Sequence, residues 1–254
     1  MHFILLERLR QGRRTLQWPA GPAPDLPDRF RGRPLVDPGK CSAGCRECGE
    51  VCPTDALQFG PGPLAALDLG KCLFCGDCAA ACPEGAIAFS RDFAMAVRER
   101  EDLLIGSPEA RLLADALDGE TRRLFGRSLR LRQVSAGGCN ACEADANVLQ
   151  TVVFDISRFG IQFVASPRHA DGLLITGPVT RNMRLALEKT YAAVPAPRLV
   201  IAMGACAISG GPYAGHPEAC DGAGGVVPVD LFIPGCPPHP LTVLDGLLRL
   251  LGRL

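Results

Sequence analysis

The sequence predicts two domains joined by a helical linker over residues 106–127. The second domain, residues 128–254, is expected to be an α/β domain with an open parallel sheet, because apolar strand-like runs alternate there with helical patterns. The first domain, residues 1–105, is expected to be built around a cysteine motif that occurs twice. Cysteines also follow three of the strand-like runs of the second domain, which predicts a further site at one edge of its sheet.

The composition excludes several classes of protein. With 254 residues, 47% of them hydrophobic, the chain can bury a sizeable core. Its formal net charge of zero gives no electrostatic reason to bind nucleic acid. No apolar run reaches the roughly 18 residues of a membrane span, and charges interrupt the apolar residues near the N-terminus, so no signal peptide is expected. We therefore expect a cytoplasmic protein, in which thirteen closely spaced cysteines favour metal binding over disulfides.

The cysteine motif is an internal duplication. CRECGEVCPTDAL (45–57) matches CGDCAAACPEGAI (75–87) at a constant offset of 30 residues. One more cysteine precedes each copy, Cys41 and Cys72, at an offset of 31, so the first copy carries one extra residue within SAG (42–44). The second copy has the spacing C-x2-C-x2-C-x3-C-P, which is typical of bacterial [4Fe–4S] sites.

This spacing has a chemical reason. Three thiolates on a tight loop reach three corners of one cluster, and the fourth cysteine begins a helix that leads away, so it serves the cluster of the other copy. The prediction is a first cluster on Cys41, Cys45, Cys48 and Cys82 and a second cluster on Cys72, Cys75, Cys78 and Cys52. Paired C-x-x-C motifs also suit structural zinc, and the extra residue leaves an altered or three-iron cluster open at the first site.

Residues 1–105 resemble the dicluster ferredoxin subunits of complex I and of membrane-bound hydrogenases. The resemblance rests on the duplicated motif and on the lead-in GRRTLQWPAGPAPDLPDRFRGRP (12–34), whose prolines predict an extended arm rather than a helix. It implies an α+β dicluster ferredoxin-like domain whose arm lies along neighbouring subunits. The segment before the arm, residues 1–10, is expected to be a short helix on the surface or at a docking site.

The linker and the second domain can be followed element by element. Ser107 and Pro108 predict a helix start, and Gly119 its end. Strands are expected at SLRLRQV (128–134), DGLLITG (171–177), RLVIAMG (198–204) and PVDLFIPG (228–235), a helix after Thr180, and a closing amphipathic helix over LTVLDGLLRLLGRL (241–254).

The carboxyl ends of parallel strands gather at one edge of a sheet, and ligands bind there. Cys139 and Cys142 follow the first strand, Cys206 lies in GACAISGG, and Cys236 lies in PGCPP. These four thiols predict a third [4Fe–4S] cluster, with glycines that let the backbone approach it. A thioredoxin-like Cys139–Cys142 pair is the alternative, but it leaves the other two cysteines unexplained. Cys220 remains, and we interpret it as an unused thiol.

Residues 128–254 resemble the cluster-binding small subunit shared by complex I and [NiFe] hydrogenases, through DISRFGIQFVASPRHADGLLITGPVTRNM, VIAMGACAISGG and PVDLFIPGCPPHP. The resemblance implies a flavodoxin-like fold and a cluster at the interface with a large catalytic subunit. Complex I members carry two adjacent cysteines at the first ligand position. The spacing Cys139-Asn140-Ala141-Cys142 is instead similar to energy-converting, formate-hydrogenlyase-type [NiFe] hydrogenases, which face the cytoplasm.

The chain thus resembles a fusion of two electron-transfer subunits. The resemblance implies a non-catalytic subunit with three [4Fe–4S] clusters, on the inner face of the cell membrane. Its partners would be a [NiFe] hydrogenase-like large subunit, membrane subunits of a complex I-like arm and an electron-donor protein. Glu143 and Asp145 are candidates for a proton relay beside the third cluster, or they are first-turn acids of a helix. The rival functions are a nickel-free, quinone-linked complex I-like module and a zinc-binding assembly protein.

Overall fold

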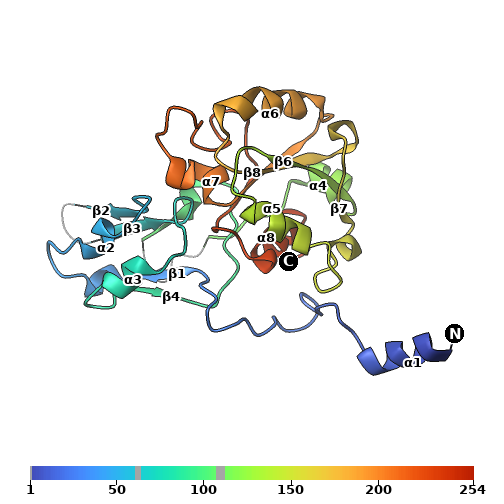
Figure 1. The fold of residues 1–254 in the computed structure, drawn as a ribbon, viewed down its shortest axis with the longest axis horizontal. Helices are drawn as coiled ribbons and strands as arrows, with labels where there is room; N and C mark the ends of the chain where they lie inside the picture. The colour runs from blue at the N-terminus through green and yellow to red at the C-terminus, as the bar shows by residue number, and fades with distance from the viewer. Residues whose placement is uncertain (1, 61–63, 107–111) are drawn as a thin grey trace.

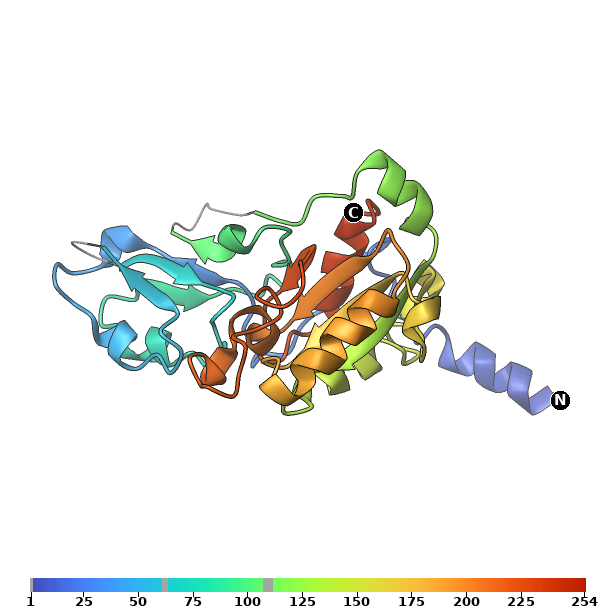
Figure 2. The same cartoon turned by 90° about the horizontal axis from the view of Figure 1, so that it is seen from above.

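The computed structural model describes residues 2–60, 64–106 and 112–254. Two halves lie side by side, and helix α1 (His2–Gln11) projects away from both of them (Figures 1 and 2). The arm that follows α1 contains no helix or strand until β1 (Pro34–Val36), as the prolines predict. It lies along the second half of its own chain, because Arg158 donates hydrogen bonds to the carbonyls of Leu16 and Trp18.

The first half is a small α+β unit. Antiparallel pairing joins β1 to β4, and a second sheet has the order β2-β3-β5. Cys48 and Cys78 lie within two short helices, and Cys52 and Cys82 follow these helices instead of beginning one as expected. Cys48, Cys72 and Cys78 are buried with the strand residues in one core. The elements after β1 are η1 (Pro38–Lys40), α2 (Glu47–Glu50), β2 (Leu57–Phe59), β3 (Leu64–Asp68), α3 (Asp77–Ala81), β4 (Ile87–Phe89), η2 (Arg100–Leu103) and β5 (Leu104–Ile105).

The second half is built on a five-stranded parallel sheet of order β10-β9-β8-β6-β7. This confirms the open parallel sheet and the four expected strands. The edge strand β7 was not expected. The elements are β6 (Leu129–Ser135), α5 (Ala141–Val148), η3 (Ile156–Phe159), β7 (Ile161–Phe163), η4 (Pro167–His169), β8 (Gly172–Thr176), α6 (Arg181–Ala193), β9 (Leu199–Met203), α7 (Ala205–Ser209), η5 (Gly211–Tyr213), β10 (Leu231–Ile233) and α8 (Pro240–Leu250).

Helices cover both faces of this sheet. Leu187 of α6 packs against alternate residues of β6, β8 and β9 on one face, and α8 packs on the other face together with α5. Figure 2 shows α6 and α8 on opposite sides of the strands. Helix α8 was expected to be amphipathic, but all its residues except Arg249 are buried. Gly246 of α8 faces both Ala96 and Ile233 of β10, so the segment around Ala96 contributes to this burial.

The linker differs from the expected helix. Residues 107–111 lie outside the described residues, and residues 112–118 are not helical. Helix α4 (Gly119–Phe125) begins where the predicted helix was expected to end, because the carboxylate of Asp118 caps it by accepting from the N–H groups of Glu120 and Thr121. The first half already meets the second before this linker, since Val97 and Phe232 pair as an antiparallel bridge beside β10.

Candidate metal centres

The first four predicted ligands come together between α2 and the end of α3. Burial raises the pKa of the Cys48 thiol, and the charges of Cys82, Cys41 and Cys45 raise it further. Such effects between thiols operate only at short range. Cys82 therefore lies with the first copy of the motif, although it belongs to the second.

The second four predicted ligands line one cavity, which contains Cys52, Cys72, Cys75 and Cys78. Burial raises the pKa of Cys72 to about 12, and the charges of the other three thiols contribute. Deprotonating such a buried thiol requires a compensating positive charge nearby. A cavity lined by four thiols, two of them buried and the fourth supplied by the other copy, fits the donor set of a [4Fe–4S] cluster.

Backbone N–H groups point at the cysteine sulfurs in corresponding places of the two copies. The N–H of Ala56 donates to Sγ of Cys52 at 3.3 Å, and the N–H of Ala86 donates to Sγ of Cys82 at 3.2 Å. Both bonds depend on a left-handed residue one position earlier, Asp55 or Gly85. The duplication therefore repeats the turn after each fourth cysteine as well as the cysteine itself.

The extra residue of the first copy does not change how its loop ends. Gly44 precedes Cys45 with a φ of 80°, and Phe74 precedes Cys75 with a φ of 55°. Both copies thus enter their C-x-x-C through a left-handed residue, which is inexpensive for glycine. The additional residue is accommodated upstream, at positions 42–43.

The third four predicted ligands gather at the carboxyl edge of the parallel sheet. Burial strongly raises the pKa of Cys142, and the charges of Glu143, Cys206, Cys236 and Cys139 raise it further. Burial also raises the pKa of Cys206 to about 11. Cys139 and Cys236 are exposed, whereas Cys142 and Cys206 are partly buried. This site therefore opens on the protein surface.

Gly204 makes room for the third site. It precedes α7 with a φ of 92°, and a Cβ atom at this position would lie 2.7 Å from Sγ of Cys142. No real Cβ approaches a sulfur so closely, and the backbone conformation also disfavours other residues. Gly204 is thus required because the thiol of Cys142, which follows a different strand, lies against it.

The two candidate relay acids differ in their surroundings. Glu143 is buried, and its Oε1 accepts hydrogen bonds from Ser135 and Thr176, both at 2.6 Å. Burial raises the pKa of Glu143, but these two bonds outweigh it and the net shift is downward. Burial raises the pKa of Asp145, which lines a cavity of about 220 Å³ together with Cys236 and His239.

The sequence interpretation missed Ser135 and Thr176. Both end parallel strands, β6 and β8, at the same edge as the cysteines. Their position after an apolar strand run was the available signal.

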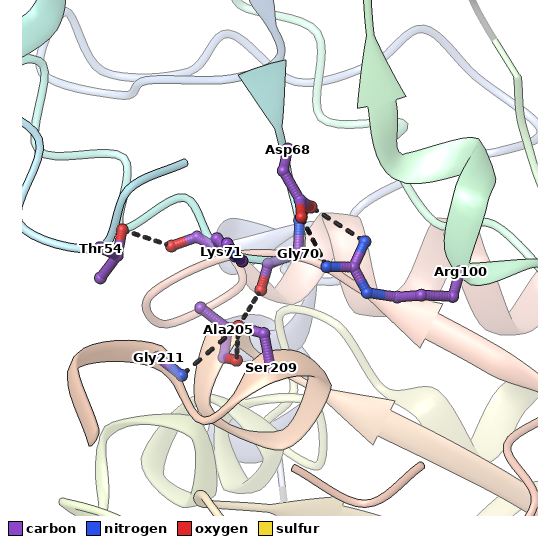
Figure 3. A network of polar contacts seen from close by, with 8 residues as sticks. All are labelled: Thr54, Asp68, Gly70, Lys71, Arg100, Ala205, Ser209 and Gly211. Atoms are coloured by element: carbon purple, nitrogen blue, oxygen red, sulfur yellow. Dashed lines mark hydrogen bonds and ion pairs between the residues drawn. The ribbon is translucent and has the colours of Figure 1, made fainter. Parts of the chain in front are cut away.

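A polar network joins the second and third sites (Figure 3). Asp68 forms a two-pronged ion pair with Arg100 and accepts the N–H of Gly70 at 2.8 Å. The hydroxyl of Ser209 in α7 donates to the carbonyl of Gly70 at 2.9 Å. The turn that leads into Cys72 is therefore bonded to the helix that carries Cys206.

All thirteen cysteines are described and all are free thiols. In the described part of the chain, no three histidine, cysteine, aspartate or glutamate side chains have the arrangement that would hold a metal ion. Among the described helices, none is both long and apolar enough to cross a lipid bilayer.

Comparison with known families supports the iron–sulfur interpretation over the zinc alternative. Residues 40–87 match the 4Fe-4S dicluster domain, and residues 139–250 match the 20-kDa subunit of NADH ubiquinone oxidoreductase. Fold and family together define an electron-transfer subunit that contains an iron–sulfur domain. The chain belongs to the family of the hydrogenase and complex I 20-kDa subunit, preceded by a 4Fe-4S dicluster domain.

Three curated relatives illustrate the range of this family. The chain is 45% identical over 130 residues to formate hydrogenlyase subunit 7 of Escherichia coli, a match that spans 50% of this chain and 50% of that relative. It is 39% identical over 132 residues to the probable membrane-bound hydrogenase subunit mbhJ of Pyrococcus furiosus, covering 52% of this chain and 79% of that one. It is 39% identical to an NADH-quinone oxidoreductase subunit of Heliobacterium modesticaldum, covering 47% and 69%.

Proposed function

We propose that this chain carries three [4Fe–4S] clusters and conducts electrons between a donor protein and the large catalytic subunit of a membrane-associated [NiFe] hydrogenase of the formate-hydrogenlyase type. The observation that carries the proposal is the gathering of twelve cysteines into three sets of four. When bound, such clusters supply one-electron transfer. The chain needs no nucleophile or general base of its own for this role.

The first half buries one thiol of the first set and two thiols of the second set. Cys48, Cys72 and Cys78 are buried in the core of the first half, and backbone N–H groups donate to the sulfurs of Cys52, Cys72 and Cys82. Hydrogen bonds to the sulfurs and exclusion of solvent are the means by which a protein adjusts a cluster's reduction potential.

The spatial order of the three sites follows from which thiols raise one another's pKa. Cys48 of the first set contributes to the raised pKa of Cys78 in the second. Cys75 of the second set contributes to the raised pKa of Cys236 in the third. The second site therefore lies between the other two. The exposed thiols of Cys139 and Cys236 mark the surface where the large subunit would dock.

Two features support the hydrogenase assignment of the second half. Cys139 and Cys142 have the spacing of the hydrogenase type, and two of the relatives are named as hydrogenase or formate hydrogenlyase subunits. The strands, renumbered within this half, have the order 2-1-3-4-5, which supports a flavodoxin-like fold. We further propose a cytoplasmic location, peripheral on the inner face of the membrane, with membrane subunits of a complex I-like arm as partners.

Asp145 is the better candidate for moving a proton near the third site. It lies partly buried beside a cavity that Cys236 also lines, whereas two hydroxyl groups fix the carboxylate of Glu143 in its ionised form. We propose that Glu143 anchors the loop between β6 and α5, and that a proton relay near the third site passes through Asp145.

A nickel-free, quinone-linked complex I-like module is the second candidate. The observation that favours it is the similarity to a relative named as a component of NADH-quinone oxidoreductase. Anaerobic isolation of the tagged chain from gently solubilised membranes distinguishes the two. Nickel in the isolated complex, together with hydrogen-dependent dye reduction, is the expected result. A large partner with abundant iron and no nickel would contradict the hydrogenase assignment while leaving the clusters in place.

A further inference from the structure

The hydroxyl of Ser209 is a direct bond between the two halves of the chain. It donates to the carbonyl of Gly70 at 2.9 Å, and it also lies 3.1 Å from the carbonyl of Ala205 in its own helix. Gly70 lies two residues before Cys72, and Ser209 lies three residues after Cys206, which is less than one helical turn. One hydroxyl thus connects a loop of the second site to the helix of the third (Figure 3).

Several hydrogen bonds hold the loop that Ser209 reaches. Asp68 is 3% exposed and accepts from the N–H of Gly70 and from both terminal nitrogens of Arg100, at 2.9 and 2.6 Å. Thr54, next to the Cys52 turn, donates to the carbonyl of Lys71 at 2.8 Å. These bonds connect the loop that contains Gly70 to the turn that carries Cys52 of the second set.

Gly70 also allows the two halves to meet closely. A Cβ atom at this position would lie 2.8 Å from Cζ of Arg100 and 2.8 Å from Cγ2 of Ile208. These distances are shorter than any normal contact, so a larger residue would have to displace the side chain of Arg100 or that of Ile208 in α7. The hydrogen bond from Ser209 and the lack of a side chain at Gly70 both favour a short distance between the Gly70 loop and α7.

We propose that the Gly70–Ser209 contact sets the separation between the second and third thiol sets, with Ser209 as a positioning residue for electron transfer between them. The proposal rests on the proposed function, since the separation matters only if an electron crosses it. Each transferred electron oxidises the second site and reduces the third, and no bond forms and no proton moves. Because tunnelling weakens steeply with distance, a small displacement of α7 would slow this step.

The test compares Ser209→Ala with the wild type in the isolated complex with its iron in place. Magnetic coupling between the reduced second and third clusters, measured by electron paramagnetic resonance, reports their separation. We expect unchanged iron content and an approximately fivefold increase in the fraction of molecules with weakened coupling, because one hydrogen bond is lost. Electron transfer to the third cluster after flash reduction should slow in the same molecules, and Ser209→Thr should restore both readouts.

Thr190→Ala is the matched control. The hydroxyl of Thr190 also donates to a carbonyl four residues earlier in its own helix, at 2.7 Å, but it lies partly buried on α6, which carries none of the predicted ligands. Gly70→Ala should weaken the coupling more than Ser209→Ala does. Amide hydrogen exchange over residues 68–72 and 205–211 gives a readout independent of electron transfer, and it should accelerate only in the Ser209 and Gly70 variants.

Three outcomes would overturn the proposal. Wild-type coupling and transfer rate in Ser209→Ala would remove Ser209 as a positioning residue and leave the proposed function intact. Loss of iron in Ser209→Ala would mean that the hydroxyl stabilises a cluster site and does not set the distance between two sites. A wild-type complex in which no electron reaches a third cluster would overturn the proposed function itself, and this inference with it.

Discussion

The thiol of Cys236, after β10, lies within electrostatic range of the thiol of Cys75, in the loop before α3. Burial raises the pKa of Cys236, and the charges of Cys139 and Cys75 raise it further. These two cysteines belong to different halves of the chain and to different predicted clusters. Their proximity means that the halves are joined at the sites as well as through their cores.

Removing one thiol from the third set should empty that site alone. In Cys236→Ser or Cys142→Ser we expect about four of the roughly twelve irons to be lost, with electron delivery to the large subunit abolished and the first two clusters retained. Iron, sulfide and zinc analysis, together with cluster spectra, checks this. Cys220→Ser is the control and should keep all its iron. Retained electron delivery in Cys236→Ser would refute the third cluster.

A single methyl group at Gly204 should have a similar effect. Gly204→Ala places a Cβ atom 2.7 Å from the sulfur of Cys142 at a φ of 92°, so the thiol must move or the helix must shift. We expect loss of the third cluster from a protein that still folds, measured as iron per chain. Gly224→Ala, where no atom lies within 4 Å of the added carbon, should retain full iron content. Equal iron in the two variants would contradict the geometry of the site.

Helix α6 offers a test of the core on the other face of the sheet. Leu187 is fully buried, and Leu187→Ala should cost about 2–5 kcal/mol. This corresponds to a fall of roughly 5–15 °C in the thermal midpoint for a chain of this size. Leu185 on the same helix is 58% exposed, so Leu185→Ala should change the stability by less than about 0.5 kcal/mol. Similar midpoints for the two variants would be inconsistent with the packing of α6.

His239 should make stability depend on pH near neutrality. Burial lowers the pKa of His239 below its ordinary value, so the folded protein binds this proton less readily than the unfolded chain does. Stability should therefore be complete above about pH 6.5 and decline as the pH falls toward the folded pKa. Protonation also opposes the bond in which the N–H of Leu241 donates to Nδ1 of His239 at the start of α8.

His239→Asn keeps an acceptor at this helix start but cannot titrate in this range. The variant should flatten the decline in thermal midpoint between about pH 6.5 and pH 5. Anaerobic melting curves at several pH values provide the comparison. An identical pH profile in the variant would show that another group is responsible.

The grouping of the cysteines could be predicted because the spacing rules of cluster sites are local. The duplicated spacing specified which cysteine crosses to the other copy, and the order of strands and glycines specified which cysteines share an edge of the parallel sheet. These rules depend on neighbouring residues and on strand direction, both of which can be read from a sequence. Whether each set binds a cluster stays a prediction that the iron analysis tests.

Other features depend on contacts between distant parts of the chain. Helix α8 has an amphipathic pattern, yet all its residues except Arg249 are buried. Ala96, far away in the sequence, packs against Gly246 of this helix, and nothing local to α8 indicates that contact. Asp118 caps a helix that starts at Gly119, where the glycine suggested an end. The bond from Ser209 to Gly70 joins residues far apart in sequence, and a serine within GACAISGG carries no sign of such a partner.

The exchange of fourth cysteines between the two motifs also affects the order in which the chain can mature. The thiols of Cys45 and Cys48 gather with that of Cys82, so a nascent chain that ends before residue 82 cannot complete its first site, although three of the four sulfurs are already present. The third set of thiols is complete only after residue 236 has been synthesised. The two sites of the first half therefore have all their sulfurs once residue 82 has been synthesised, long before the third site is complete, so the proposed clusters can be inserted in that order.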